Sequence, residues 1–448
     1  MNFKDSIFNN AFIKDVWTLF SGTAIAQIIG LAFLPLLTRL FLPEEFGIFY
    51  IFLTTASILS VVTTGGYEKS FVLPKHDKEA SQLLLVSLIL SLSVTFLSFI
   101  ILFFLNEWGN IFFQTGRSQI ILWLIPVYAF LFGAFRIFQN WSIRHNKYNW
   151  VGSSNIFRSG SLSALQTGFG LYQTGSFGLV IASCISQLPP IWFLIRKNIK
   201  VLNNITKKDV KDAYRIGVEY YSFPFYKMPS DLLNEISIQI PLYVLKVVFS
   251  DLAVGIYSLP QKLMSQPSRL IGQAVGEVFY RKTSELYSQN IDISEITFAT
   301  FRTLFLVGVI PFTIVMFWGQ EIFSFAFGQE WGSSGRIASY LSPWLLFVFA
   351  GSPISYIFLI KQKIRLSFYL NLILLIIRFS ALLIGGLIFK DLEITIILFA
   401  CSSLIYWIYI SLFSLHLGGV KIRKSVLFLV MVLVLVVLPI GLVNFFII

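Results

Sequence analysis

Apolar stretches of about 20 residues follow one another along almost the whole chain, and each is long enough to cross a bilayer core of about 30 Å as an α-helix. The pattern predicts thirteen such segments, at approximately 16–38, 46–65, 81–105, 118–138, 151–173, 177–195, 218–247, 252–279, 297–318, 336–360, 364–388, 393–415 and 425–447. The seventh is the weakest, because prolines and charges interrupt it: Pro224, Lys227, Pro229, Asp231, Glu235 and Pro241. The sequence therefore predicts an all-α polytopic membrane protein.

Composition excludes a soluble protein. Of the 448 residues, 56% are hydrophobic and only 12% are charged, whereas a soluble domain carries roughly 25% charged residues. A soluble chain of this length would also divide into about three domains joined by polar linkers, and the sequence has no such linkers.

Lysine and arginine in the connections predict the orientation. With the N-terminus in the cytoplasm, the inside connections hold 22 Lys and Arg and the outside connections hold 5. Such an excess marks the cytoplasmic side of a membrane protein. The net charge of +12 therefore reflects topology and attraction to anionic membrane lipids rather than nucleic-acid binding. We expect a multi-pass protein of a bacterial cytoplasmic membrane.

The longest basic connection, RKNIKVLNNITKKDVKDAYR at 196–215, divides the predicted segments into six before it and seven after it. The two halves resemble each other weakly, since RLFLPEEFGIFY joins the first two segments and VVFSDLAVGIYS joins the seventh and eighth. A duplicated bundle is a common plan of transporters. We predict a six-helix bundle over 1–197, a cytoplasmic linker over 198–215, a second six-helix bundle over 216–416 and an additional helix over 425–447.

Seven basic residues lie within or at the edges of the apolar segments. A centrally placed Arg or Lys costs roughly 2.5–3.5 kcal/mol in a bilayer, so these side chains snorkel, form pairs or line a hydrated interior. Arg136 and Arg302 lie near cytoplasmic ends, where snorkelling explains them. Arg269 and Arg378 lie near mid-span and favour an interior role. Arg158, about 10 Å deep by helical rise, is open to both interpretations, and Lys227 and Lys262 complete the set.

Lys227, Asp231 and Glu235 follow one another in steps of four, which places them on one face of a helix. One interpretation is structural: Lys227 and Asp231 neutralise each other and Glu235 pairs elsewhere. The other is that Asp231 or Glu235 binds H⁺ or Na⁺ during a transport cycle, because a desolvated carboxylate loads protons near neutral pH.

Catalytic and metal-binding motifs do not stand out. The three histidines, His76, His145 and His416, are scattered, and the spacing of a metal site, a nucleophile constellation or a Gly-rich nucleotide loop is missing. A membrane polysaccharide polymerase would carry a sizeable outer loop, and a glycosyltransferase would carry a folded domain with clustered acids. We expect a protein that is not an enzyme and has no cofactor or metal.

Several stretches resemble the polysaccharide-transport (Wzx-type) flippases of the multidrug/oligosaccharidyl-lipid/polysaccharide exporter superfamily. These are SGTAIAQIIGLAFLPLLTRLFLPEEFGIF (21–49), GGYEKSFVLPK (65–75), GQEIFSFAFGQEWGSSG (319–335) and LSPWLLFVFAGSPIS (341–355). The family often has Arg before the Tyr-Glu of the second stretch, where this chain has Gly66. The thirteenth segment also exceeds the twelve-span plan of the family.

The resemblance implies a fold like that of multidrug and toxin extrusion exporters and a function in O-antigen, capsule or exopolysaccharide biosynthesis. It implies that the protein moves an undecaprenyl-pyrophosphate-linked oligosaccharide to the outer leaflet by alternating access, with a polysaccharide polymerase and a chain-length regulator as candidate partners. Arginine suits such a substrate, because its planar fork binds phosphate through two hydrogen bonds. The expected cationic cavity contains Arg158, Lys227, Lys262, Arg269 and Arg378. A cation exporter of the same superfamily is the alternative, although it would favour an acidic cavity.

Overall fold

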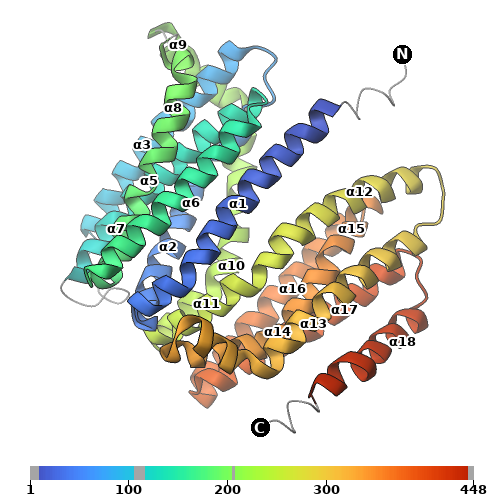
Figure 1. Ribbon diagram of the computed structural model, residues 1–448. Helices are drawn as coiled ribbons and strands as arrows, with labels where there is room; N and C mark the ends of the chain where they lie inside the picture. The colour runs from blue at the N-terminus through green and yellow to red at the C-terminus, as the bar shows by residue number, and fades with distance from the viewer. Residues whose placement is uncertain (1–9, 105–116, 204–206, 442–448) are drawn as a thin grey trace. The chain divides into compact units, whose positions relative to one another are not determined.

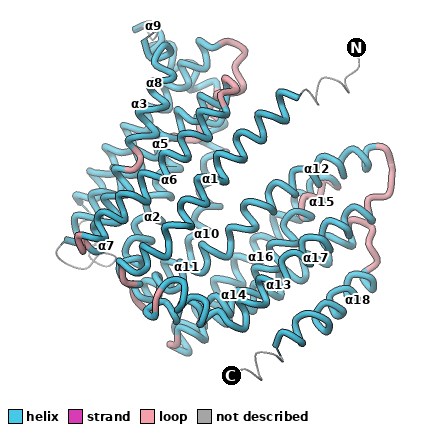
Figure 2. Tube along the Cα trace, in the orientation of Figure 1, coloured by secondary structure: helices cyan, strands magenta, loops and turns pink. Residues whose placement is uncertain are grey.

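The computed structural model describes residues 10–104, 117–203 and 207–441. Over this part of the chain every regular element is a helix, and short loops join consecutive helices (Figure 2). The prediction of an all-α polytopic membrane fold is confirmed. The chain folds into two compact units, Met1–Tyr243 and Val244–Ile448.

The first unit is a bundle of long helices with a core of large aromatic side chains. Helix α1 packs on α6, both α2 and α3 pack on α5, and α8 packs on α5 and α6. Phe52, Phe135 and Trp141 are fully buried in this core. Its elements are α1 (Asn10–Leu40), α2 (Pro43–Thr63), η1 (Tyr67–Ser70), α3 (Asp77–Phe104), α5 (Arg117–Arg144), α6 (Tyr148–Leu171), α7 (Gly175–Ile185), α8 (Leu188–Asn203), α9 (Lys207–Glu219), η2 (Phe223–Lys227) and most of α10 (Met228–Val248).

The second unit is built around a pair of long antiparallel helices, α13 and α14 (Figure 1). Helix α14 also packs on α11 and α17, and α16 packs on α17. The elements are α11 (Asp251–Pro267), η3 (Ser268–Gly272), α12 (Gln273–Ser288), α13 (Ser294–Phe327), η4 (Gln329–Trp331), α14 (Gly332–Ile354), α15 (Ile357–Ile360), α16 (Ile364–Leu383), η5 (Ile384–Phe389), α17 (Leu392–Leu417), α18 (Ile422–Val432) and η6 (Leu433–Val437).

Helices coincide with all thirteen predicted segments, and ten of them are long and apolar enough to cross a membrane by length and composition. The other three are α6, α10 and the run α11–η3–α12, which fall outside this set and carry Arg158, the acids Asp231 and Glu235, and Arg269. Helix α6 has 24 residues and a length of about 36 Å, so it is long enough to span. The last predicted segment continues past residue 441, outside the described residues.

The sequence places the division of the chain in the connection 198–215, whereas the two compact units meet within α10. In the structure, that connection is occupied by the end of α8 and by most of α9, and residues 204–206 lie outside the described part. The predicted bundle boundaries stay a prediction.

Candidate functional site

The loop after α2 is anchored by a glycine pair. Gly65 and Gly66 have positive φ angles of 59° and 74°, which L-residues with a side chain rarely adopt. This turn sends the chain into η1, where the Tyr67 hydroxyl donates a hydrogen bond to the Gly217 carbonyl of α9 at 2.8 Å. The stretch GGYEKS is therefore a structured loop whose residues are mostly buried.

Glu68 of η1 is a buried acid. Its side chain is 1% exposed, and its Oε1 accepts a hydrogen bond from Arg136 Nη2 of α5 at 2.7 Å. The second oxygen, Oε2, has no hydrogen-bond partner among the described residues. The interpretation of Arg136 as a snorkelling residue is wrong, because it forms this ion pair instead. Glu68 was missed from the sequence, because hydropathy assigned it to a solvated loop.

Asp231 of α10 lies between two ammonium groups. Its Oδ2 pairs with Lys69 of η1 at 2.6 Å, and its Oδ1 pairs with Lys227 of η2 at 2.5 Å. Lys227 lies in a π-helical turn that opens directly into α10, a geometry frequently found at functional sites. The predicted Lys227–Asp231 pair is confirmed, and Lys69 makes the group net cationic.

A polar row continues along α10 in steps of four residues. Glu235 Oε1 accepts hydrogen bonds from the Ser57 hydroxyl and the Gln239 amide, both at 2.9 Å. Gln239 in turn accepts from Thr54 at 3.0 Å, and the Tyr243 and Thr55 hydroxyls share a hydrogen bond of 2.9 Å.

Glu235, Gln239 and Tyr243 lie in the first unit, and each has a hydrogen-bond partner on α2. The row from Lys227 to Tyr243 extends about 24 Å along the helix axis, close to the thickness of the hydrocarbon core. Among the described residues, Glu235 pairs with no basic group, so its neighbours on this row are neutral hydrogen-bond donors. We call this set the α10 polar row; it comprises Lys227, Asp231, Glu235, Gln239 and Tyr243.

Arg158 is the cation within the first unit. It lies on α6, half-buried, with its guanidinium 5.1 Å from the ring centre of Phe132 and 5.5 Å from that of Phe135. Both rings belong to α5. Within the described residues no carboxylate pairs with Arg158, so aromatic faces stabilise its charge.

Arg378 repeats this arrangement in the second unit. It lies on α16, with its guanidinium 4.8 Å from the ring centre of Trp344 and 5.5 Å from that of Phe399. Its Nε donates a hydrogen bond to the Ser403 hydroxyl of α17 at 2.9 Å. No carboxylate of the described residues lies in ion-pair distance, so the outer nitrogens of the fork remain available for an anion.

Arg269 and Lys262 have a different environment. Arg269 lies in the π-helical turn η3, where α11 passes into α12, and its side chain is exposed. Lys262 lies one helical turn before the end of α11 and is also exposed. The structure does not bring these two side chains together with Arg378, so they remain separate candidates.

Comparison with known proteins identifies the family to which the chain belongs. A family model described as "Polysaccharide biosynthesis protein" matches residues 12–280. The chain belongs to this family. A curated relative, "Capsular polysaccharide biosynthesis protein CapF" of Staphylococcus aureus, is 27% identical over 243 residues, which is 52% of this chain and 59% of that protein. The match therefore spans less than two thirds of the relative's length.

Solved structures show the same fold as this polysaccharide biosynthesis protein. "Lipid II flippase MurJ, inward closed conformation" has a TM-score of 0.71 at 14% identity, covering 96% of this chain and 97% of that one. An outward-facing multidrug resistance MATE family transporter of the MOP superfamily has a TM-score of 0.58 at 16% identity, covering 92% and 96%. These neighbours are transporters and flippases, not enzymes.

The family, the fold and the apolar helices together support a multi-pass membrane transporter related to polysaccharide biosynthesis. The predicted resemblance to polysaccharide-transport flippases is confirmed. Within the described residues, no group of three His, Cys, Asp or Glu side chains is placed to hold a metal ion. The two stacked arginines and the α10 polar row are the polar features on which we base the proposed function.

Proposed function

We propose that this polysaccharide biosynthesis protein is a flippase for oligosaccharide repeat units linked to undecaprenyl pyrophosphate. It moves them from the cytoplasmic to the outer leaflet by alternating access. The observation that carries the proposal is the pair of half-buried arginines, Arg158 and Arg378, one in each unit. Each is stacked on two aromatic rings and has no carboxylate partner among the described residues.

An unpaired guanidinium in a membrane-spanning helix is costly, at roughly 2.5–3.5 kcal/mol at mid-depth. Aromatic stacking recovers part of this cost, about 0.5–2 kcal/mol. An anionic ligand would recover the rest, and the planar fork is matched to phosphate oxygens. A pyrophosphate-linked glycan supplies that anion.

The ion pairs formed by the acidic residues argue against export of cationic compounds. A cation exporter needs an unneutralised acidic group at its binding site. Asp231 is held by two lysines, and Glu68 is paired with Arg136. Only Glu235, among the acids of the α10 polar row, pairs with neutral groups alone.

Glu235 is therefore our candidate for coupling to H⁺ or Na⁺, and Asp231 is the less favoured of the two predicted acids. A carboxylate that accepts hydrogen bonds from Ser57 and Gln239 can exchange a proton or a small cation without first breaking an ion pair. The resemblance to CapF favours a capsular polysaccharide as the final polymer. A polymerase and a chain-length regulator remain candidate partners, and a bacterial cytoplasmic membrane with the N-terminus inside remains the proposed location.

Complementation tests the function. A bacterium that lacks its own repeat-unit flippase would receive the wild-type chain or the single variants R158Q, R269Q and R378Q. K75Q serves as control, because Lys75 is exposed and forms no ion pair within the described residues. At matched membrane levels, we expect wild type and K75Q to restore surface glycan and R378Q to reduce it at least tenfold. Restoration by wild type and by all three arginine variants would support flipping and reject these residues as the site.

A further inference from the structure

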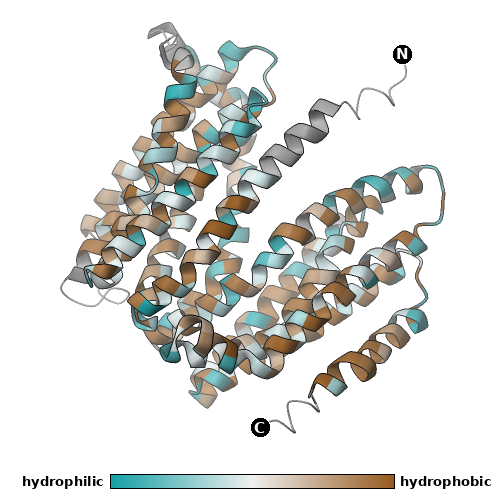
Figure 3. Ribbon diagram, viewed as in Figure 1, coloured by the Kyte–Doolittle hydropathy of each residue, from teal (hydrophilic) through white to brown (hydrophobic). Residues whose placement is uncertain are grey.

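Helix α18, which exceeds the two predicted six-helix sets, packs on the second unit through a narrow stripe. The buried residues of α18 are Ser425, Phe428 and Val432. The centre of the Phe428 ring lies 5.7 Å from that of Phe298 and 5.9 Å from that of Phe305. Most of the remaining α18 side chains are exposed and apolar (Figure 3). The helix therefore leaves hollows on both sides of the stripe.

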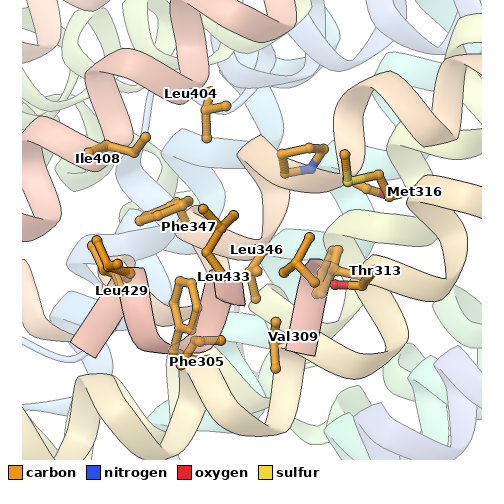
Figure 4. A pocket seen from close by; sticks show the side chains of 16 residues that line it. Phe305, Val309, Thr313, Met316, Leu346, Phe347, Leu404, Ile408, Leu429 and Leu433 are labelled. Atoms are coloured by element: carbon orange, nitrogen blue, oxygen red, sulfur yellow. The ribbon is translucent and has the colours of Figure 1, made fainter. Parts of the chain in front are cut away.

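One hollow is an apolar cavity of about 340 Å³ between α13, α14, α17 and α18 with η6. Figure 4 shows Val309, Leu404 and Leu433 pointing into it. Almost all of the lining side chains are apolar. The hydroxyl of Ser342, which also lines the cavity, donates a hydrogen bond to the Ala338 carbonyl at 2.9 Å. An apolar cavity of about 150 Å³ stays dry and accepts hydrocarbon ligands, so a cavity of this size within a membrane suits a lipid chain rather than water.

The other hollow is a crevice of about 650 Å³ between α13 and α18. Its lining is apolar except for Arg302 and Thr303 of α13 and Lys424 of α18. Both cations are exposed, and neither forms an ion pair within the described residues. Lys424 Nζ lies 4.3 Å from the Phe298 ring centre, which holds the ammonium group over the crevice.

The two hollows are neighbours, because Phe428 lines the crevice and contacts Phe305, which lines the apolar cavity. From Leu306, which lines the crevice one helical turn past Arg302, to Met316 in the cavity wall, α13 rises about 15 Å. This rise equals one leaflet of a hydrocarbon core of about 30 Å. A phosphate at the level of Arg302 and Lys424 therefore places acyl chains alongside α13 down to the middle of the bilayer.

We propose that the crevice and the apolar cavity together form a binding site for an anionic phospholipid of the surrounding membrane. Its phosphate is held by Arg302 and Lys424, and its acyl chains lie along α13 beneath α18. Basic pockets between membrane helices recognise such headgroups. The site is separate from Arg378, and the inference does not depend on the proposed flippase function.

Lipid retention by the purified full-length chain tests this inference. The protein would be exchanged into detergent with equal amounts of phosphatidylglycerol and phosphatidylcholine, and retained lipid would be counted by native mass spectrometry. Wild type should retain phosphatidylglycerol preferentially. The double variant R302Q/K424Q should retain it about 25-fold less, since each basic residue contributes roughly fivefold.

Two further variants separate the parts of the site. R423Q removes a neighbouring cation of α18 that does not line the crevice, and it should retain lipid like wild type. L404F fills the apolar cavity and should weaken retention while the cations stay in place. Equal retention of both lipids by wild type, or unchanged retention by R302Q/K424Q, would overturn the proposal. Displacement of phosphatidylglycerol by equimolar undecaprenyl pyrophosphate would also overturn it, because the site would then belong to a polyprenyl substrate.

Discussion

Lys69 and Asp231 form an ion pair of 2.6 Å although 162 residues separate them in the chain. The pair joins η1 to the start of α10, and Lys227 approaches the other carboxylate oxygen. Asp231 thus pairs with two lysines that lie in different helical turns, Lys69 in η1 and Lys227 in η2. The loop GGYEKS and the seventh predicted segment form a single structural unit at this point.

Removal of the Asp231 charge is expected to leave Lys69 and Lys227 facing each other. D231N should lower the free energy of unfolding by about 1 kcal/mol, a modest value because all three side chains are partly exposed and solvent screens them. The thermal midpoint of the purified protein in detergent would measure this. K75Q serves as the control and should change it little. Equal midpoints for D231N and K75Q would mean that the ion pair does not hold the loop.

Glu68 should matter more than Asp231, because its side chain is buried at 1% exposure. Loss of one partner of a buried ion pair costs about 3–5 kcal/mol, since the other charge stays buried and unpaired. E68A should therefore lower the thermal midpoint much further than D231N. The double variant E68Q/R136M should recover part of the loss, because it leaves no buried charge. No recovery would show that Glu68 acts through contacts other than Arg136.

Hydropathy predicted the helices because membrane spans must be long and apolar, and the three least apolar spans are those that carry Arg158, the acids of α10 and Arg269. Periodicity also predicted the pairing of Lys227 with Asp231, because residues four apart share a helix face. Periodicity along one helix could not predict which residues pair between helices. Glu68 with Arg136, and Arg378 with Trp344 and Phe399, depend on which helices are neighbours and how they are rotated.

The resemblance to polysaccharide-transport flippases leads us to expect Arg at the position of Gly66. Its φ of 74° is costly for a residue with a side chain, although a Cβ there would meet Met228 only at ordinary contact distance, 3.6 Å. G66R should therefore lower the free energy of unfolding by about 1–2 kcal/mol. G66N should cost less, because asparagine tolerates this backbone conformation better. Thermal midpoints would rank the three proteins, and a G66R midpoint at or above that of wild type would contradict the expected strain.

E235Q separates ionisation from hydrogen bonding, because glutamine can still accept from Ser57 and Gln239. If Glu235 couples transport to an ion, E235Q should transport at a rate that no longer responds to an imposed pH or Na⁺ gradient. Transport in proteoliposomes with and without the gradient would measure this. S57A should keep the gradient response, since it preserves the carboxylate. A wild-type gradient response in E235Q would move the coupling site to another residue.

Translocation of a fluorescent undecaprenyl-pyrophosphate-linked oligosaccharide in proteoliposomes tests the central claim most directly. The label that becomes accessible on the far side would be compared for wild type, R378Q and K75Q at equal protein content. We predict that wild type and K75Q translocate the lipid and that R378Q does so at least tenfold more slowly, because the variant loses the guanidinium that stacks on Trp344 and is left free to bind phosphate. Absence of translocation by well-folded wild type, with or without an ion gradient, would contradict the account.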